Sequence, residues 1–348
     1  MRKIYLLLML SLAIFNSSVA QQFQVSGKIT ETSKEPVAFA SVYVKNTNKG
    51  TSANAEGLYT LNLDKGTYTL MYKAIGFKTI ERQVTVNSNL IADQVLPSES
   101  YTLNNVVITS NAEDPAYNII RQAIAKRKIH LNEVKEYSTN VYIKGSQKLV
   151  GAPKKFFGRD IQKTLDLDTN RKGILYLSES RSVFSFRRPN DVHEEMISSK
   201  VSGRNNAFSF NKASDLIINF YDNLLFENSG LSSRSFVSPI ADNALFYYRY
   251  KLIGQTDENG ATINKIEVIP RRKNDPVFRG TIYIADESWR IVGTDLYLTE
   301  EAGINFIDTL NVSQQFEKFE NVYMPTTTKF QFNGDVMKFK FEGYYVGI

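Results

Sequence analysis

The sequence has no cysteine, and it has only two histidines and one tryptophan among 348 residues. The missing cysteines exclude disulfide bonds and a cysteine nucleophile, and they exclude a lipid-modified cysteine behind an export signal. The fold must therefore be held by its hydrophobic core alone, and a chain of this length can bury a core of sufficient size.

The excess of positive over negative charge is also small. The formal net charge is +6 at pH 7, and it falls to +4 when Arg2 and Lys3, each contributing +1, are removed. Clusters of basic residues such as 126–128, 187–188 and 271–273 are far apart in the sequence. Dispersed clusters of this kind predict solvent-exposed surface, so we expect no nucleic-acid partner.

Long hydrophobic runs are absent beyond residue 20, so no transmembrane helix is expected. Residues 1–20 have the three parts of a signal peptide: the charged Arg2 and Lys3, an apolar stretch over 4–15, and the small residues Ser18 and Ala20. The apolar stretch is too short to span a bilayer. We expect cleavage after Ala20 and export to the periplasm or outer membrane.

Motifs that carry catalysis are scarce as well, with no Gly-x-Ser-x-Gly and no phosphate-binding glycine loop. Ser209 and Lys212 match Ser-x-x-Lys, but its companion motifs are absent. His130 and Glu133 match a His-x-x-Glu metal pair with His193 as a third ligand, yet His130 falls at a helix end, where a cation is favourable without metal. We expect no enzyme activity, metal or other cofactor; a zinc metallocarboxypeptidase is the least favoured alternative.

Between residues 23 and 86, short β-rich runs are separated by turn residues. Apolar and polar positions alternate along these runs, for example at Ala40, Val42 and Val44 and at Tyr59, Leu61 and Leu63. Residues 54–57 and 64–66 supply the glycine and Asx residues that tight hairpins need. The pattern is typical of a small β-sandwich.

Several motifs follow one another in this region: Val25-Ser-Gly-Lys-Ile29, Glu35-Pro-Val-Ala-Phe-Ala-Ser-Val-Tyr-Val44, Lys49-Gly-Thr-Ser-Ala-Asn54, Glu56-Gly-Leu-Tyr59, Gly66-Thr-Tyr-Thr69 and Ile75-Gly-Phe77. Together they resemble the carboxypeptidase regulatory-like domain. The resemblance implies a transthyretin/prealbumin-like β-sandwich that is non-catalytic and carries no zinc ligands. It also implies the amino-terminal part of an envelope protein of a Gram-negative bacterium.

A polar connector, residues 97–113, contains a β-prone segment with Leu103, Val106, Val107 and Ile108. A similar segment follows this sandwich in many TonB-dependent transporters, where TonB captures it by strand addition. Two interpretations stay open. The segment is either a last strand of the sandwich, which we favour, or a partner strand for TonB.

Two main helices are predicted beyond the connector. The first begins with Asp114 as N-cap and Pro115 at the first helical position, and Ile119, Ala123 and Arg127 mark one of its faces. The second covers residues 213–226, with an apolar stripe of Leu216, Ile217, Phe220 and Leu224.

Residues 145–168 and 190–211 lack a clear pattern and are expected to be long loops. From residue 244 onward the chain is nearly all strand, with strands expected at 246–252, 263–269, 281–285, 290–298, 305–316, 326–332 and 336–346. Short turns between consecutive strands predict an antiparallel meander with a curved sheet. The fold class is therefore mainly β with a few helices: a sandwich, then a curved antiparallel sheet that could form a half-barrel.

A second set of motifs spans residues 114–348: Asp114-Pro-Ala-Tyr-Asn-Ile-Ile120, Val141-Tyr-Ile-Lys-Gly145, Glu195-Met-Ile-Ser-Ser-Lys-Val-Ser-Gly203, Phe236-Val-Ser-Pro-Ile-Ala-Asp-Asn-Ala-Leu-Phe246 and Asn274-Asp-Pro-Val-Phe-Arg-Gly280. They resemble the domain of unknown function that accompanies the regulatory-like sandwich in outer-membrane proteins. Members usually continue into a membrane barrel, so the chain is either a fragment or a short relative. The strands after Gly280 are also similar to the half-barrel of periplasmic lipoprotein carriers.

Aromatic and apolar strand residues are the candidates for a ligand-facing surface. Phe246, Tyr248, Ile282 and Phe330 are expected to line the concave sheet, with residues 213–226 filling the hollow or being displaced by an acyl chain or peptide. Asn305, Asp308, Asp242 and the pair 314–315 are polar groups that need partners on a half-buried sheet. They form either an inter-strand network or a ligand-facing patch.

The predicted organisation is a signal peptide (1–20), a sandwich (21–96), a linker (97–113) and an antiparallel β domain (114–348). The function that we expect is non-enzymatic binding or assembly at the periplasmic face of the outer membrane, with a TonB-linked uptake component as the alternative. The expected partners are other envelope proteins or the outer membrane, together with a lipid or peptide ligand.

Overall fold

The computed structural model describes residues 22–47, 49–102, 113–203, 210–227, 229–258, 260–319 and 322–348. The chain divides into two compact units, of which the first contains residues up to 72 together with 79–96. The second unit contains residues 73–78 and 97–348. The predicted signal peptide at 1–20 and the predicted partner strand at 103–108 lie outside the described residues.

The first unit is the expected β-sandwich, built from two four-stranded sheets. One sheet places β4 (Leu58–Asp64) beside β1 (Gln22–Glu31), which also pairs with β7 (Leu90–Ile91) and β8 (Gln94–Leu96). The other has the order β3 (Gly50–Ser52), β2 (Ser41–Val44), β5 (Gly66–Lys73) and β6 (Ile80–Val86).

Alternation along β4 shows how the sequence specifies this sandwich. Tyr59, Leu61 and Leu63 are buried, whereas the residues between them face solvent, as the pattern predicts. The buried Tyr59 hydroxyl donates to the carbonyl oxygen of Ala92 at 2.6 Å and lies 2.9 Å from the Tyr72 hydroxyl. Its polar end is therefore satisfied inside an apolar core.

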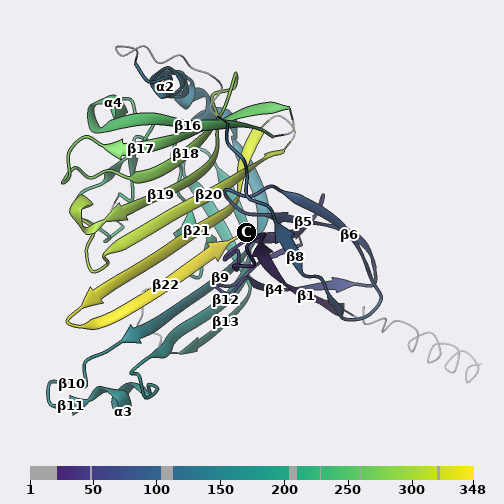
Figure 1. Cartoon of the computed structure of the whole chain (residues 1–348), viewed down its shortest axis with the longest axis vertical. Helices are drawn as coiled ribbons and strands as arrows, with labels where there is room; N and C mark the ends of the chain where they lie inside the picture. Colours follow the sequence, from purple (N-terminus) through teal and green to yellow (C-terminus); the bar gives the residue numbers. More distant parts are fainter. Residues whose placement is uncertain are drawn as a thin grey trace, which may run out of the picture. The chain divides into compact units, whose positions relative to one another are not determined.

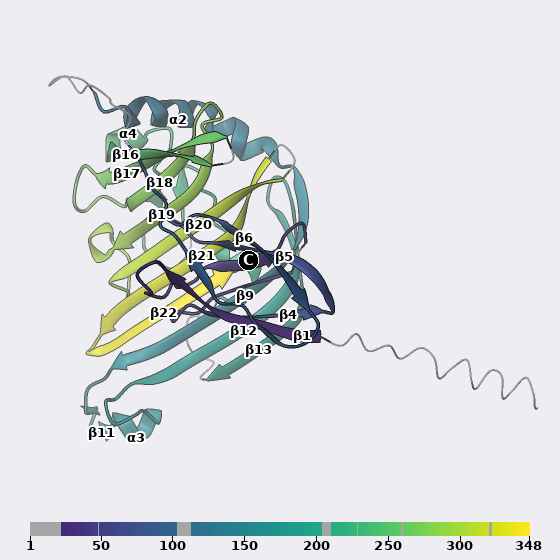
Figure 2. The same ribbon diagram turned by 45° about the vertical axis from the view of Figure 1, so that its right-hand side comes forward.

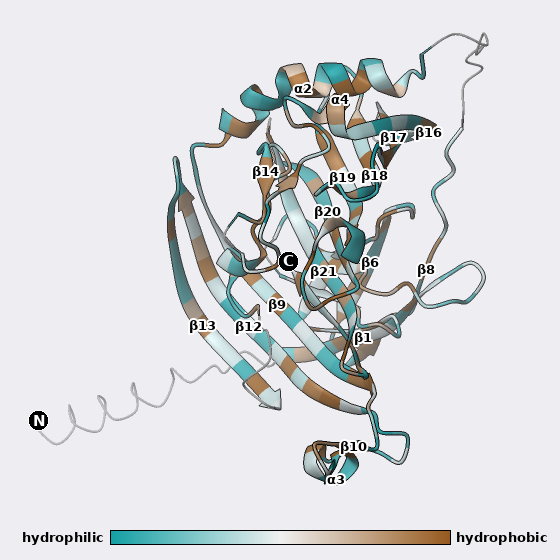
Figure 3. Cartoon of the chain, turned by 90° about the vertical axis from the view of Figure 1, so that its left-hand side faces the viewer, coloured by the Kyte–Doolittle hydropathy of each residue, from teal (hydrophilic) through white to brown (hydrophobic). Residues whose placement is uncertain are grey.

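The second unit is organised around one ten-stranded antiparallel sheet with the order β13-β12-β9-β22-β21-β20-β19-β18-β17-β16 (Figure 1). Its strands are β9 (Glu136–Gly151), β12 (Gly173–Arg187), β13 (Asp191–Gly203), β16 (Tyr248–Glu258), β17 (Ala261–Pro270), β18 (Arg279–Ala285), β19 (Ile291–Thr299), β20 (Thr309–Phe319), β21 (Val322–Val336) and β22 (Phe339–Gly347). The sheet is strongly curved (Figures 1 and 3).

The pairing of β22 with β9 joins the three strands β9, β12 and β13 to the seven strands β16 to β22. Tyr345 lies opposite Gly145 in this pairing, and a Cβ at position 145 would come within 2.3 Å of the Tyr345 ring. Only glycine fits there. The last strand of the chain therefore lies beside the first strand of the unit.

Helix α2 (Ala116–Glu133) lies beside β16 (Figures 1 and 2). The Asp114 carboxylate accepts hydrogen bonds from the backbone N of Ala116 at 2.9 Å and from that of Leu252, on β16, at 3.0 Å. Asp114 thus ties the start of the helix to the sheet, although the N-cap is Pro115, one residue later than the sequence predicts. No helix within the described ranges has the length and hydrophobicity needed to cross a membrane.

The two predicted long loops are wrong. β9 continues to Gly151 and is followed by β10 (Lys155–Phe156), β11 (Arg159–Asp160) and α3 (Ile161–Leu165), and most of 190–211 is strand β13. Because β13 is an edge strand whose side chains are nearly all exposed on both faces, it has no alternation of apolar and polar residues. The periodic signal of a half-buried strand is therefore missing there.

The predicted helix at 213–226 is also wrong beyond its first turn, the 3₁₀ helix η2 (Ala213–Leu216). Leu216, Ile218 and Phe220 are buried at every second position, whereas Ile217 is 50% exposed, which is the spacing of an extended chain. The strand expected from 246 begins at Tyr248, after the short helix α4 (Ala244–Tyr247). The fold class, mainly β with a sandwich and a curved open sheet, is confirmed.

Candidate functional site

The concave face of the sheet is covered by residues 210–227 and 229–247, which we call the strap. Its regular elements are short: η2, β14 (Leu224–Leu225), β15 (Phe236–Val237) and α4. Figure 3 shows β14 and the adjoining loops on this face, with α2 above them. The strap, α2 and the inner faces of the strands bury their side chains in one continuous hydrophobic cluster.

Aromatic rings make the main contacts between strap and sheet. Phe220 and Phe236 pack against Phe278, with ring centroids 5.5 and 6.1 Å apart, and Phe226 packs against Phe330 at 6.0 Å. Phe220, Phe236 and Phe278 are each at most 1% exposed. This packing fills the concavity with the chain's own side chains.

Glu194 on β13 anchors the beginning of the strap. Its carboxylate accepts hydrogen bonds from the backbone N of Ala213 at 2.7 Å and of Ser214 at 3.1 Å, and from the Ser182 hydroxyl at 2.7 Å. Burial alone would raise the pKa of Glu194, but these hydrogen bonds outweigh it and hold the pKa below its usual value. A charged carboxylate from the sheet edge therefore caps the first turn of the strap.

Gln314 on β20 anchors the middle of the strap. The side chain is 1% exposed, and its Nε2 donates to the carbonyl oxygen of Ile218 at 3.0 Å and to the Thr328 hydroxyl at 3.2 Å. Because this part of the strap is extended and forms no helix or sheet, the carbonyl oxygen of Ile218 needs a hydrogen-bond donor from elsewhere. The Gln314 side chain, on the sheet, supplies that donor.

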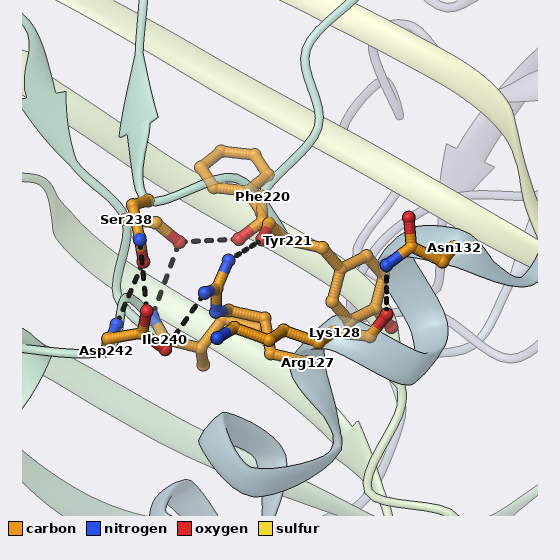
Figure 4. Close-up of polar contacts among 9 residues, drawn as sticks. Arg127, Lys128, Asn132, Phe220, Tyr221, Ser238, Ile240 and Asp242 are labelled. Atoms are coloured by element: carbon orange, nitrogen blue, oxygen red, sulfur yellow. Dashed lines mark hydrogen bonds and ion pairs between the residues drawn. The ribbon is translucent and has the colours of Figure 1, made fainter. Parts of the chain in front are cut away.

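Arg127 on α2 anchors the end of the strap (Figure 4). Its guanidinium donates to the carbonyl oxygen of Tyr221 and, at 2.9 Å, to the carboxylate of Asp242. The Arg127 side chain is 4% exposed, whereas that of Asp242 is 52% exposed. A buried cation on the helix is thus paired with a half-exposed carboxylate on the strap.

Asp242 is held by more than this pair. Asn223 donates through Nδ2 to its second carboxylate oxygen at 3.1 Å, and the backbone N of Asp242 donates to Oδ1 of Asn223 at 3.0 Å. The hydrogen bond from Arg127, followed by that from Asn223, keeps the pKa of Asp242 below its usual value. The pair therefore remains charged under all but strongly acidic conditions.

The end of α2 is fastened to the turn between β18 and β19. Glu133 forms a bidentate ion pair with Arg290, and Nε2 of His130 donates to the carbonyl oxygen of Ser288 at 3.0 Å. The His130 ring also lies 5.6 Å from the ring of Tyr221 in the strap. His130 thus touches both the turn and the strap.

The pKa of His130 is lowered, first by burial and then by the nearby Arg290 cation. Below about pH 6.5 the unfolded chain therefore binds a proton at His130 more readily than the folded chain does. The free energy of unfolding should fall as the pH is lowered through 6.5, with a slope of up to about 1.4 kcal/mol per pH unit. Urea unfolding of His130→Gln, which keeps a donor for Ser288, should lack this slope; an unchanged slope would show that His130 is not its source.

The predicted ligand-facing residues lie in different environments. Tyr248, Ile282 and Phe330 are buried in the cluster under the strap. Phe246 does not line the sheet, because it belongs to α4 and is 79% exposed. Asn305 and Asp308 precede β20 and are exposed, rather than lying within a strand as the sequence predicts.

The fold does not bring together His130, Glu133 and His193, the three residues considered as zinc ligands from the sequence. No group of three or more potential metal ligands occurs in the part of the chain that the structure describes. The Glu133 carboxylate is held by Arg290, and His193 is exposed on β13 at a shallow groove of about 400 Å³. Arg187 and Glu136, which also line this groove, form an ion pair at 3.3 Å.

Sequence reasoning missed the roles of Arg127 and Glu194. Arg127 was assigned to a solvent-exposed basic cluster, but it is 3% exposed. A signal was present, since Arg127 continues the face of Ile119 and Ala123, both buried. Glu194 gave no signal because its partners come from a segment whose path cannot be read from periodicity.

The sequence matches a family model described as a family of unknown function (DUF5686) over residues 119–348. The chain belongs to this family. Residues 25–108 match the model of the CarboxypepD_reg-like domain, so the two families occur in the expected order.

Curated relatives match the amino-terminal third of the chain. The TonB-dependent receptor P39 of Formosa agariphila is 27% identical over 116 residues, which is 33% of this chain and 11% of the receptor. The TonB-dependent receptor SusC of Bacteroides thetaiotaomicron is 31% identical over 108 residues, 31% of this chain and 10% of the receptor. The chain thus spans about a tenth of the length of these relatives.

Solved structures give weaker similarities. A DUF1329 family protein from Desulfovibrio piger is 10% identical with a TM-score of 0.25, covering 68% of this chain and 92% of that one. A LolA superfamily protein from Nitrosomonas europaea is 10% identical with a TM-score of 0.21, covering 67% and 91%.

Proposed function

We propose that the chain is a non-catalytic, exported binding protein at the periplasmic face of the outer membrane, and that its ligand is an acyl chain or apolar peptide. The ligand would lie against the concave face of the sheet, in the place that the strap occupies. The observation that carries this proposal is the strap itself. A large apolar sheet face is covered by a segment that has little regular structure and is fixed by a few polar anchors.

Exchange of the strap for a ligand is energetically reasonable. Removing Phe220 and its neighbours from the sheet costs the apolar burial that they contribute, and an acyl chain restores burial of the same kind. Segments with few backbone hydrogen bonds in regular secondary structure also unfold locally at a low free-energy cost. The strap therefore has the properties of a cover that a competing apolar ligand can displace.

Arg127 favours a ligand with an anionic head group. When the strap leaves, Arg127 loses both Tyr221 and Asp242. Its Nε already has no hydrogen-bond partner within the described ranges. A guanidinium stranded in an apolar site binds carboxylate or phosphate well. The proposed ligand class is therefore an anionic amphiphile, such as a fatty acid or a phospholipid.

Mass spectrometry of lipid extracted from the natively purified full chain tests this function. We expect co-purified anionic lipid in the wild type, and less of it, with a weaker preference for anionic over zwitterionic head groups, in Arg127→Met. The matched control is Lys128→Ala, the next residue on α2, which is exposed. Protein that is folded and free of lipid would contradict the proposal.

A second candidate, a TonB-linked uptake component, is favoured by the similarity of the amino-terminal third to TonB-dependent receptors. In this function residues 103–109 would add as a strand to TonB. The test is titration of the carboxy-terminal domain of TonB with the full chain and with a Val106→Asp/Ile108→Asp variant. Binding that is lost in the variant supports this function, and no binding by the wild type removes it.

A further inference from the structure

Strand β13 is a long free edge of the sheet. It contains 13 residues and pairs with β12 on one side, and no described strand pairs with its other side. At about 3.4 Å per residue it extends for roughly 44 Å. Its outer row of backbone N–H and C=O groups is therefore open for pairing along the whole strand.

The side chains of β13 do little to prevent such pairing. Four apolar residues on it are well exposed: Val192 at 42%, Met196 at 38%, Ile197 at 60% and Val201 at 41%. The strand contains no proline, and its one lysine is Lys200. Soluble proteins usually protect an edge of this length with proline, several lysines or a covering segment, so its apolar exposure indicates a partner.

A bulge divides the strand into two halves. Met196 lies opposite Ser182, and Ser198 lies opposite Arg181, so that Ile197 is the extra residue. We call the face of β13 toward the strap its inner face. Because paired residues point to the same side of a sheet, the pairing with β12 places Glu194 and Met196 on this face before the bulge, and Ser199 and Val201 on it after the bulge. The outer face carries Glu195 before the bulge and Lys200 after it.

We propose that two copies of this chain pair through β13, antiparallel, about a two-fold axis between Ile197 and Ser198. In this register residue i faces residue 395 − i of the other copy. Glu195 of each copy then lies opposite Lys200 of the other, on the same outer face, so that two opposite-charge pairs form symmetrically. Met196 lies opposite Ser199 on the inner face, and Ile197 of each copy lies opposite Ser198 of the other copy, next to the axis.

The bulge explains why a second copy fits better than an arbitrary extended peptide. A bulge bends a strand and increases its twist, so a straight partner strand loses register at that point. A second copy related by an axis through the bulge is bent at the same place. In this register, inner-face residues of one copy also lie opposite inner-face residues of the other, and outer-face residues lie opposite outer-face residues, on both sides of the bulge.

Charge reversal with sedimentation equilibrium of the full chain tests the proposal. We expect a dimer for the wild type and a dissociation constant raised about tenfold or more for Glu195→Lys and for Lys200→Glu, because each creates two like-charge pairs. The double variant Glu195→Lys/Lys200→Glu should recover the dimer. The control is Lys148→Glu on β9, whose lysine pairs with Glu342 at 2.7 Å within the sheet.

Three outcomes would overturn the proposal. The first is a wild type that remains monomeric at concentrations up to about 100 μM. The second is a dimer that both single reversals leave intact. The third is a dimer that the double reversal fails to restore while circular dichroism shows the fold unchanged. None of these readouts depends on ligand binding, so they leave the proposed function to its own test.

Discussion

Replacing Asp242 by asparagine is expected to cost more stability than replacing Arg127 by methionine, although Asp242 is the more exposed partner. Asp242→Asn leaves the Arg127 cation buried without its carboxylate, and a stranded buried charge is strongly destabilising. Because solvent still reaches the carboxylate side of the pair, we expect a loss of about 2–3 kcal/mol rather than the full penalty of a deeply buried ion. Arg127→Met leaves a carboxylate that water can solvate and keeps the apolar stem, so about 1 kcal/mol is expected.

Urea unfolding followed by tryptophan fluorescence measures this difference. The chain has one tryptophan, Trp289, between β18 and β19, so its signal reports on the second unit. The double variant Arg127→Met/Asp242→Asn should be about as stable as Arg127→Met alone, because the stranded charge is gone. A larger loss for Arg127→Met than for Asp242→Asn would show that the pair does not anchor the strap as described.

Phe220→Ala is expected to lower the free energy of unfolding by about 3–5 kcal/mol, the usual range for removing a fully buried aromatic side chain. Phe220 is 1% exposed and packs against Phe278, the residue before β18. The substitution leaves a cavity between strap and sheet, so the variant should also bind a fluorescent fatty-acid probe more tightly than the wild type. Both effects have the same cause, namely weaker attachment of the strap.

Ile217→Ala is the matched control for Phe220→Ala. Ile217 lies in the same segment but is 50% exposed, so its truncation should change stability by no more than about 0.5 kcal/mol and leave probe binding unaltered. Equal effects of the two substitutions would mean that the strap is not packed through Phe220. A destabilised Phe220→Ala that binds the probe no better than the wild type would argue against a displaceable cover.

Much of the fold is readable from sequence because alternation reports on half-buried strands. Tyr59, Leu61 and Leu63 in the sandwich, and Tyr248 and Tyr250 on β16, are buried as their spacing predicts. β13 escaped detection because an exposed edge strand has no buried face to mark it. Its existence depends on pairing with β12, which is a long-range property of the sheet.

The strap was mistaken for a helix for a related reason. Leu216, Phe220 and Leu224 have helical spacing, yet Leu224 is 44% exposed and Ile218, between the first two, is buried. Sequence periodicity cannot show that Gln314 and Arg127 offer hydrogen bonds to the carbonyls of an extended segment. Those hydrogen-bond partners stabilise an irregular, extended path for this segment, although the local sequence alone favours a helix.

Hydrogen exchange of the full chain, measured with and without saturating anionic phospholipid, tests the central claim most directly. If the strap covers a ligand-binding face, lipid should speed amide exchange in residues 210–227 and 229–247 while strands β18 to β21 keep their protection. Exchange in the strap that stays unchanged under lipid saturation, or that changes only together with the whole sheet, would contradict the account.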